Sequence, residues 1–361
     1  MLLNLSKMAT FSLYFGFYSI KKYSFMFSNF SRLVFSSFLL FGLVSCDGTS
    51  TTETTTTTTN PVQEKPLLPV PAFNQDSAYH FVEEQVAFGA RFPNSEAHQK
   101  TGDYIINKLK RFDKINVQVQ NFTAAAFDGK MLSGRNIMAS FNPEIKKRVL
   151  LAAHWDTRPF ADQDDERTDE PILGANDGGS GVGILLEIAR TLSVSTEQPQ
   201  IGIDMIFFDL EDYGDNSTPN SYCLGSQHWG KNKMPENYTA YYGILLDMAG
   251  AKNAKFAQEG YSMQTAPSVV KNVWNMAHRI GYGGFFPFQQ VSPITDDHVY
   301  VNQLTNIPMI DIIEYSTEGK GYFGSYWHTH DDNMDVIGKE TLKAVGQTVT
   351  HVIYNEENKA Q

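Results

Sequence analysis

The stretch IGIDMIFFDLED, residues 201–212, is a nearly continuous apolar run that ends abruptly in acidic residues. A short apolar run of this kind, bounded by polar residues, is typical of a β-strand buried on both faces. Asp209, Glu211 and Asp212 follow the run directly. The stretch therefore predicts a central strand with chemically useful side chains at its carboxyl end.

Two further stretches repeat this arrangement. RVLLAAH, residues 148–154, ends in His154, and YYGILLDMAG, residues 241–250, carries Asp247 after its apolar run. The Gly-rich stretch GANDGGSGVG places Asp177 in a loop ahead of a helical pattern. In open α/β sheets ligands bind outside the carboxyl ends of the strands, so we expect these side chains to meet along one edge.

The remaining periodic stretches alternate between strand and helix patterns. Strands are predicted at residues 115–122, 134–141 and 307–315, and helices at residues 76–89, 95–112, 181–192, 266–281 and 338–357. Buried strands separated by helices predict a three-layer α/β/α fold with a mixed, largely parallel central sheet.

The N-terminal part of the chain predicts a targeting segment and not part of the folded domain. Residues 1–46 resemble a bacterial lipoprotein signal, with Met26 as an alternative start and a short apolar segment that ends at Cys46. That segment is too short to favour a membrane-spanning anchor. We expect a lipid on Cys46, a location in the bacterial envelope facing the periplasm or cell surface, and a Thr/Pro-rich disordered tether at 47–72. A single catalytic domain is then expected at 73–361.

The overall charge argues against one class of partner. The 361 residues contain 29 Lys and Arg against 40 Asp and Glu, which gives a net charge of −11. Nucleic-acid binding requires a basic face, so no nucleic-acid partner is expected. The two cysteines, Cys46 and Cys223, lie on opposite sides of the predicted processing site, and Cys223 is expected to be a small buried thiol.

The acids at the strand ends indicate a metal. Several carboxylates and imidazoles without a nearby lysine or arginine would repel one another in a half-buried cleft, so the cluster requires a cation. Asp and His ligands without thiolates favour zinc or a similar divalent ion. The stretch WHTHDDN, residues 327–333, offers two further histidines.

Six motifs together resemble metallopeptidase family 28, and most closely its animal-type glutaminyl cyclases and their bacterial relatives. They are AAHWDTRP, GANDGGSGVGILLEIAR, FFDLED, LLDMAGA, ITDDH and WHTHDDN, and the resemblance extends from Phe73 to the C-terminus. The resemblance implies cyclisation of N-terminal glutamine in peptides or proteins to pyroglutamate, with one zinc ion held by each chain. Separately from the resemblance, we expect a monomer.

The resemblance also implies roles for individual residues. It makes Asp177, Asp212 and His328 the zinc ligands, and it leaves His330 at a variable position that does not bind metal. It implies that Glu211 is the catalytic acid and base, with Asp247 and Asp296 hydrogen-bonded around it, and that Trp327 and Phe323 form the pocket wall.

The sequence departs from the animal enzymes in three ways. Asp212 replaces a glutamate ligand, no tryptophan follows the acidic pair, and the paired cysteines of the secreted animal forms are absent. Two other functions remain open. A two-metal aminopeptidase would use five residues that are all present: His154, Asp177, Asp212, Asp247 and His328. The other open alternative is a surface lipoprotein that has lost enzymatic activity.

Overall fold

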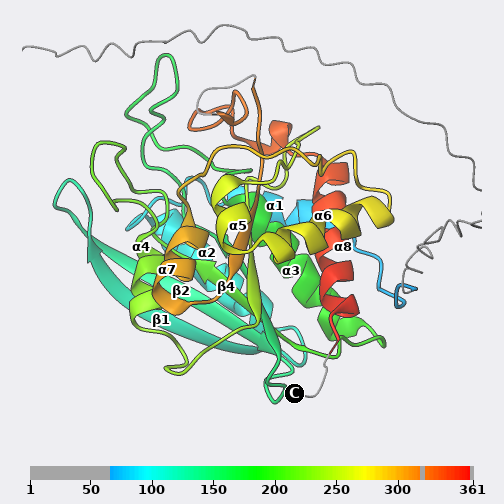
Figure 1. Ribbon diagram of the computed structural model, residues 1–361. Coiled ribbons are helices and arrows are strands. Elements are labelled where there is room, and N and C mark those ends of the chain that lie inside the picture. Colours follow the sequence, from blue (N-terminus) through cyan, green and yellow to red (C-terminus); the bar gives the residue numbers. More distant parts are fainter. Residues whose placement is uncertain (1–65, 318–321, 358–361) are drawn as a thin grey trace, which may run out of the picture. The chain divides into compact units, whose positions relative to one another are not determined.

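The computed structural model describes residues 66–317 and 322–357, and one mixed sheet of six strands organises them (Figure 1). The strand order across the sheet is β1-β2-β4-β3-β5-β6. The strands are β1 (Asn116–Ala125), β2 (Met131–Phe141), β3 (Arg148–His154), β4 (Gly202–Phe208), β5 (Tyr242–Asp247) and β6 (Met309–Ile313).

Strands β4, β3, β5 and β6 run parallel to one another, whereas β1 pairs antiparallel with β2 and β2 pairs antiparallel with β4. All residues of β4 and β5 are buried, as expected for parallel strands that have helices on both faces. The predicted mixed, largely parallel sheet is confirmed.

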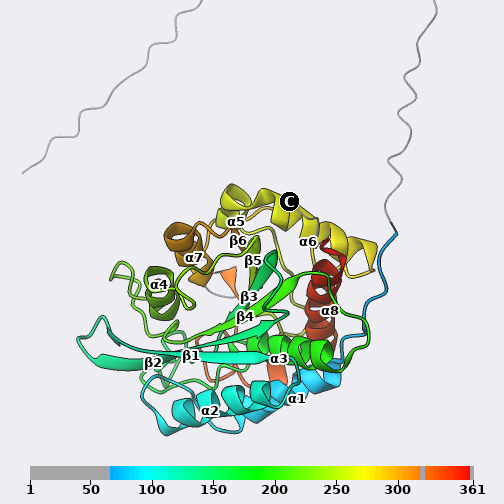
Figure 2. The ribbon, with the colours of Figure 1, turned by 90° about the horizontal axis from the view of Figure 1, so that it is seen from below.

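Helices cover both faces of the sheet and make it the middle of three layers (Figure 2). The larger hydrophobic cluster joins one face to α1 (Gln75–Val86), α2 (Glu96–Lys110), α3 (Gly179–Val194), α6 (Pro267–Arg279) and α8 (Lys339–Asn355). A smaller cluster joins the opposite face to α4 (Leu224–Lys231) and α7 (Asp297–Thr305) through Trp229 and Val301. Consecutive strand residues such as Leu150 and Leu151 enter opposite clusters, because successive side chains of a strand point to opposite faces of the sheet.

Among the described residues, three α-helices have no counterpart in the predictions: α4, α5 (Gly260–Thr265) and α7. All are short, at eight, six and nine residues, so each shows little of the helical period. Helix α7 begins inside the ITDDH motif, where the side chain of Asp296 caps it by accepting the N–H of Asp297.

The start of the folded part lies earlier than Phe73. Leu67 and Val70 pack against the larger cluster, and the Leu68 N–H donates to the Asn355 side chain at 2.8 Å. The last residues of the expected tether therefore belong to the domain, because Leu67 and Val70 are partly buried against it. The predicted signal, Cys46 and the rest of the tether lie outside the described residues. Among the helices that are described, none has the length and apolar character needed to cross a bilayer.

Candidate active site

The three expected zinc ligands meet at the carboxyl edge of the sheet. Asp177 precedes α3, Asp212 follows β4, and His328 belongs to the loop before α8. The His328 Nε2 atom lies 3.5 Å from Asp212 Oδ1 and 3.8 Å from Asp177 Oδ2, and one ligand atom from each residue lies within 4.8 Å of the others. Segments about 150 residues apart in the chain thus converge on one point.

Two buried carboxylates hold the backbone of the ligand-bearing loops. Asp332 accepts the N–H groups of Asn176 and Asp177 at 2.7 and 3.1 Å. Asp156 accepts those of Glu211 and Asp212 at 3.0 and 3.2 Å. Burial, together with the nearby charge of Asp177, raises the pKa of Asp332 to about 8. Each pair of adjacent N–H groups is fixed by one carboxylate, so the ligand loops have little freedom.

Four residues beside the site have left-handed backbone conformations although none is glycine. They are Leu210, Cys223, Met248 and His328, with φ angles of 58°, 57°, 44° and 55°. Such conformations are uncommon outside glycine and occur often at functional sites, where surrounding contacts hold them in place. Here they redirect the chain next to Glu211, Asp247 and Trp327.

A second group of potential ligands adjoins the first. His154 Nε2 lies 3.1 Å from Asp247 Oδ1 and 3.1 Å from Asp177 Oδ1. Burial alone would lower the pKa of His154, but its carboxylate neighbours raise it well above the ordinary value. Asp177 therefore belongs to both groups of potential ligands. The five residues that a two-metal site would need are brought together.

A cavity of about 250 Å³ opens onto these groups. All of the residues for which the resemblance implies a role line it, together with several for which no role was expected. Its walls are Asp177, Glu211, Asp212, Asn216, Tyr222, Asp247, Met248, Ile294, Thr295, Asp296, Ile313, Phe323, Trp327 and His328. Tyr222 and Asn216 follow the acidic pair, in the segment where the tryptophan of animal enzymes is missing.

Glu211 lies at the inner wall of this cavity, in contact with two groups from other segments. Its Oε1 atom accepts a hydrogen bond from the Cys223 thiol at 3.1 Å, and an Asp296 oxygen lies within 4.8 Å of both groups. Burial first, and then the neighbouring negative charges of Asp212 and Asp296, raise the pKa of Glu211 well above its ordinary value. Burial raises the pKa of Asp247 to about 7 as well. Carboxyl groups with raised pKa values suit proton transfer near neutral pH.

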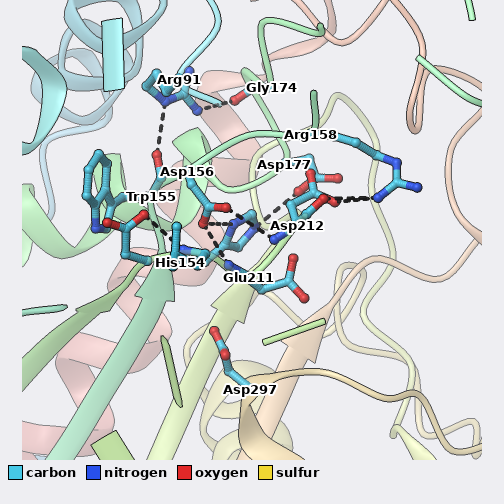
Figure 3. A network of polar contacts seen from close by, with 12 residues as sticks. Arg91, His154, Trp155, Asp156, Arg158, Gly174, Asp177, Glu211, Asp212 and Asp297 are labelled. Atoms are coloured by element: carbon cyan, nitrogen blue, oxygen red, sulfur yellow. Dashed lines mark hydrogen bonds and ion pairs between the residues drawn. The ribbon is translucent and has the colours of Figure 1, made fainter. Parts of the chain in front are cut away.

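The expectation that no basic residue lies near the acids is wrong. Arg158, only 3% exposed, directs its Nη1 atom to Asp212 Oδ1 at 3.5 Å (Figure 3). The arginine is part of the AAHWDTRP motif. The orientation of its guanidinium group is set by Asp162, and no pattern in the sequence indicated this contact. His330 lies outside the cavity lining, and its Nδ1 atom is 2.7 Å from Asp164.

The donor set fits a divalent ion of the zinc type. It offers one imidazole nitrogen and two carboxylates, all from buried residues, and Asp212 Oδ2 is buried without a hydrogen-bond partner. Three protein ligands beside an open cavity are the pattern of a catalytic site, because the fourth position is left for another molecule. The His328 Nδ1 atom lies 3.0 Å from Asp162, as metal-binding histidines require of their second nitrogen.

The sheet and its acidic edge define the zinc exopeptidase and glutaminyl cyclase-like fold. The chain belongs to Peptidase family M28, whose family model matches residues 136–353. A Parabacteroides distasonis structure described as a Zn-dependent exopeptidase is 54% identical, with a TM-score of 0.77, and covers 80% of this chain and 100% of its own.

Several relatives carry the cyclase name. The structure of Tannerella forsythia glutaminyl cyclase is 50% identical, with a TM-score of 0.77, and covers 80% of this chain and 100% of its own. The Bos taurus glutaminyl-peptide cyclotransferase is 24% identical over 289 residues, which is 70% of this chain and 74% of that protein. Both enzyme names within the family, exopeptidase and cyclase, thus occur among the similar proteins.

Proposed function

We propose that this protein cyclises the N-terminal glutamine of peptides or proteins to pyroglutamate and releases ammonia. The observation that carries the proposal is the cavity of about 250 Å³, in which Glu211 and the zinc-type donor set face the same space. The 50% identity to a solved glutaminyl cyclase supports the same reaction.

The reaction needs only one substrate, because nucleophile and electrophile belong to the same residue. The α-amino nitrogen bonds to the carbon of the side-chain amide, and the bond from that carbon to the amide nitrogen breaks. One proton passes from the attacking nitrogen to the departing one, which leaves as ammonia, and no water is consumed. Glu211 accepts this proton and then delivers it.

Asp296 and Asp247 line the same cavity as Glu211, and we infer that their carboxyl groups help to keep it in place for both transfers. Asp296 caps α7 and Asp247 ends β5, so both are fixed by regular structure. The side chains of Trp327 and Phe323 contact each other, with ring centroids 5.0 Å apart, and form an aromatic wall of the cavity. An apolar wall in the same cavity as the base favours a folded glutamine side chain, which brings the amine close to the amide carbon.

Asp177, Asp212 and His328 would hold one zinc ion. When bound, zinc would polarise the side-chain carbonyl oxygen of the glutamine and stabilise negative charge that develops on it. Zinc is also consistent with the M28 family and with the exopeptidase relative.

A zinc aminopeptidase is the second candidate, and one observation favours it. His154, Asp177 and Asp247 could hold another metal ion beside the first. The two functions differ in their products, since a peptidase releases a free amino acid and a cyclase releases ammonia. Incubation of the zinc-loaded protein with glutaminyl and leucyl peptides separates them. Ammonia from the glutaminyl peptide alone supports cyclisation, whereas free leucine supports the peptidase.

We further propose, from the sequence alone, that a lipid on Cys46 anchors the enzyme in the bacterial envelope. Labelling of cells with a tagged fatty acid tests this. The wild-type protein should carry the label and Cys46→Ala should not, whereas equal labelling of both would contradict the proposal.

A further inference from the structure

Arg158 lies in the loop after β3 and connects two of the three proposed metal ligands. Its Nη1 atom donates to the main-chain oxygen of Asp212 at 3.0 Å and lies 3.5 Å from Oδ1 of the same residue. Its Nε and Nη2 atoms donate to the two carboxylate oxygens of Asp162, at 2.7 and 3.1 Å. This two-point contact fixes both the position and the plane of the Asp162 carboxylate.

Asp162 in turn contacts His328, the other metal ligand of this pair. Its Oδ1 atom, which already accepts from Arg158, lies 3.0 Å from Nδ1 of His328. A proton on Nδ1 leaves Nε2 as the lone-pair nitrogen, and Nε2 is the atom that faces Asp177 and Asp212. The main-chain N–H of Gln163 also donates to the main-chain oxygen of His328 at 3.2 Å. The loop thus holds His328 through both its ring and its backbone.

We propose that Arg158 and Asp162 form a positioning unit that sets the metal affinity of the site. The unit holds Asp212 and His328 in a metal-binding arrangement, because Arg158 fixes the main chain of Asp212 and Asp162 fixes the ring of His328. This inference rests on the proposed metal centre and goes beyond it, because it assigns affinity to residues that do not touch the ion.

A purely structural role for Arg158 would predict a different result. Arg158 also donates to the main-chain oxygen of Gly214, at 3.3 Å, so its loss could loosen that loop without any effect on the ligands. Asp162 separates the two roles, because it is 34% exposed and acts on His328 directly. Asp162→Asn keeps the shape of the side chain but removes the charge.

The test measures zinc affinity rather than turnover. Apoprotein is prepared for wild type, Arg158→Met, Asp162→Asn and the control Arg167→Met, and the Kd for zinc is determined by competition with a chromophoric chelator. Arg167 belongs to the same loop, but it is half exposed and pairs with Glu170. Loss of a residue that is hydrogen-bonded to a metal ligand typically weakens metal binding by about 10- to 100-fold. We expect this loss for Arg158→Met and Asp162→Asn, and an unchanged Kd for Arg167→Met.

Circular dichroism of each apoprotein shows whether it is folded. Where Arg158→Met is folded, the double variant should bind zinc about as weakly as the weaker single variant, because both residues act through one unit. Should Arg158→Met not fold, Asp162→Asn decides alone. A wild-type Kd in folded Asp162→Asn overturns the inference. Failure of the metal centre would appear separately, as a wild type that binds no zinc, and failure of the cyclase proposal as a zinc-loaded wild type that releases no ammonia.

Discussion

At the scale of single residues, each reactive residue is held by a side chain that lies between 12 and 166 residues away in the chain. Glu211 contacts Cys223, Asp177 is fixed through Asp332, and His328 contacts Asp162. The residue types at the strand ends could be predicted from the sequence, because an acid after a buried strand is visible in the pattern. The partners could not, because hydrogen bonds between residues far apart in the chain leave no periodic signal.

Replacement of Glu211 by glutamine tests its role as acid and base. The variant keeps the size of the side chain but cannot accept the proton, so turnover should fall by about 10²- to 10⁴-fold. The zinc content should not change, since Glu211 is not among the proposed ligands. Ammonia release and metal analysis are the measurements, with exposed Glu83→Gln as the control. Unchanged turnover would remove Glu211 from the mechanism.

The thiol of Cys223 is expected to orient Glu211. This side chain is fully buried and donates to Glu211 Oε1 at 3.1 Å. Cys223→Ser retains a donor, whereas Cys223→Ala does not. We expect the alanine variant to lose about 5- to 30-fold in kcat, which corresponds to roughly 1–2 kcal/mol for one hydrogen bond, and KM to change little. Equal kcat values for the two variants would show that the thiol only fills space.

At the scale of elements, the site depends on how closely α3 approaches β5. A Cβ atom added at Gly181, in the first turn of α3, would lie 2.2 Å from the main-chain oxygen of Leu246. The long helices and buried strands were predicted with the correct type because they bury whole periodic faces. Short helices such as α7 were not, since they depend on caps and neighbours more than on a period.

Gly181→Ala should therefore push α3 away from β5. We expect a loss of about 1–3 kcal/mol in the free energy of unfolding, because the backbone must move to relieve the overlap. Gly284→Ala is the matched control, since a Cβ atom there would meet nothing within 4 Å. Urea unfolding of both variants measures the difference. Equal stability would mean that the approach of the two elements is looser than described.

Glu259 connects α5 to the cavity wall and gives a dependence on pH. Its carboxylate accepts the N–H groups of Tyr261, Ser262 and Ile294, and it lies 3.1 Å from His298 Nε2. Burial opposes ionisation of Glu259, but His298 and these donors outweigh it and lower its pKa from 4.5 to about 2. A lowered pKa contributes stability that is complete above 4.5 and is lost as the pH falls toward 2.

The prediction concerns the difference in stability between wild type and Glu259→Gln. Wild type should be the more stable of the two at pH 7, and the difference should shrink steadily below pH 4.5. Urea unfolding at a series of pH values measures it. A difference that stays constant down to pH 3 would show that the charge of Glu259 does not stabilise the fold.

At the scale of the whole molecule, one sheet edge collects ligands, base and pocket wall from segments spread between residues 154 and 332. The class of fold and the position of the site at this edge were predicted, since both follow from the order of strands and helices. The missing pieces, Arg158 with Asp162 above all, depend on side-chain directions that only the folded chain fixes.

The proposed site at the carboxyl ends of the strands converts an N-terminal glutamine to pyroglutamate without consuming water. The most direct measurement incubates the zinc-loaded protein with a glutaminyl peptide and analyses the products by ammonia assay and mass spectrometry. We expect one ammonia per peptide, a blocked N-terminus and no free amino acid. Release of free glutamine, or an intact peptide after prolonged incubation with zinc-loaded protein, would contradict it.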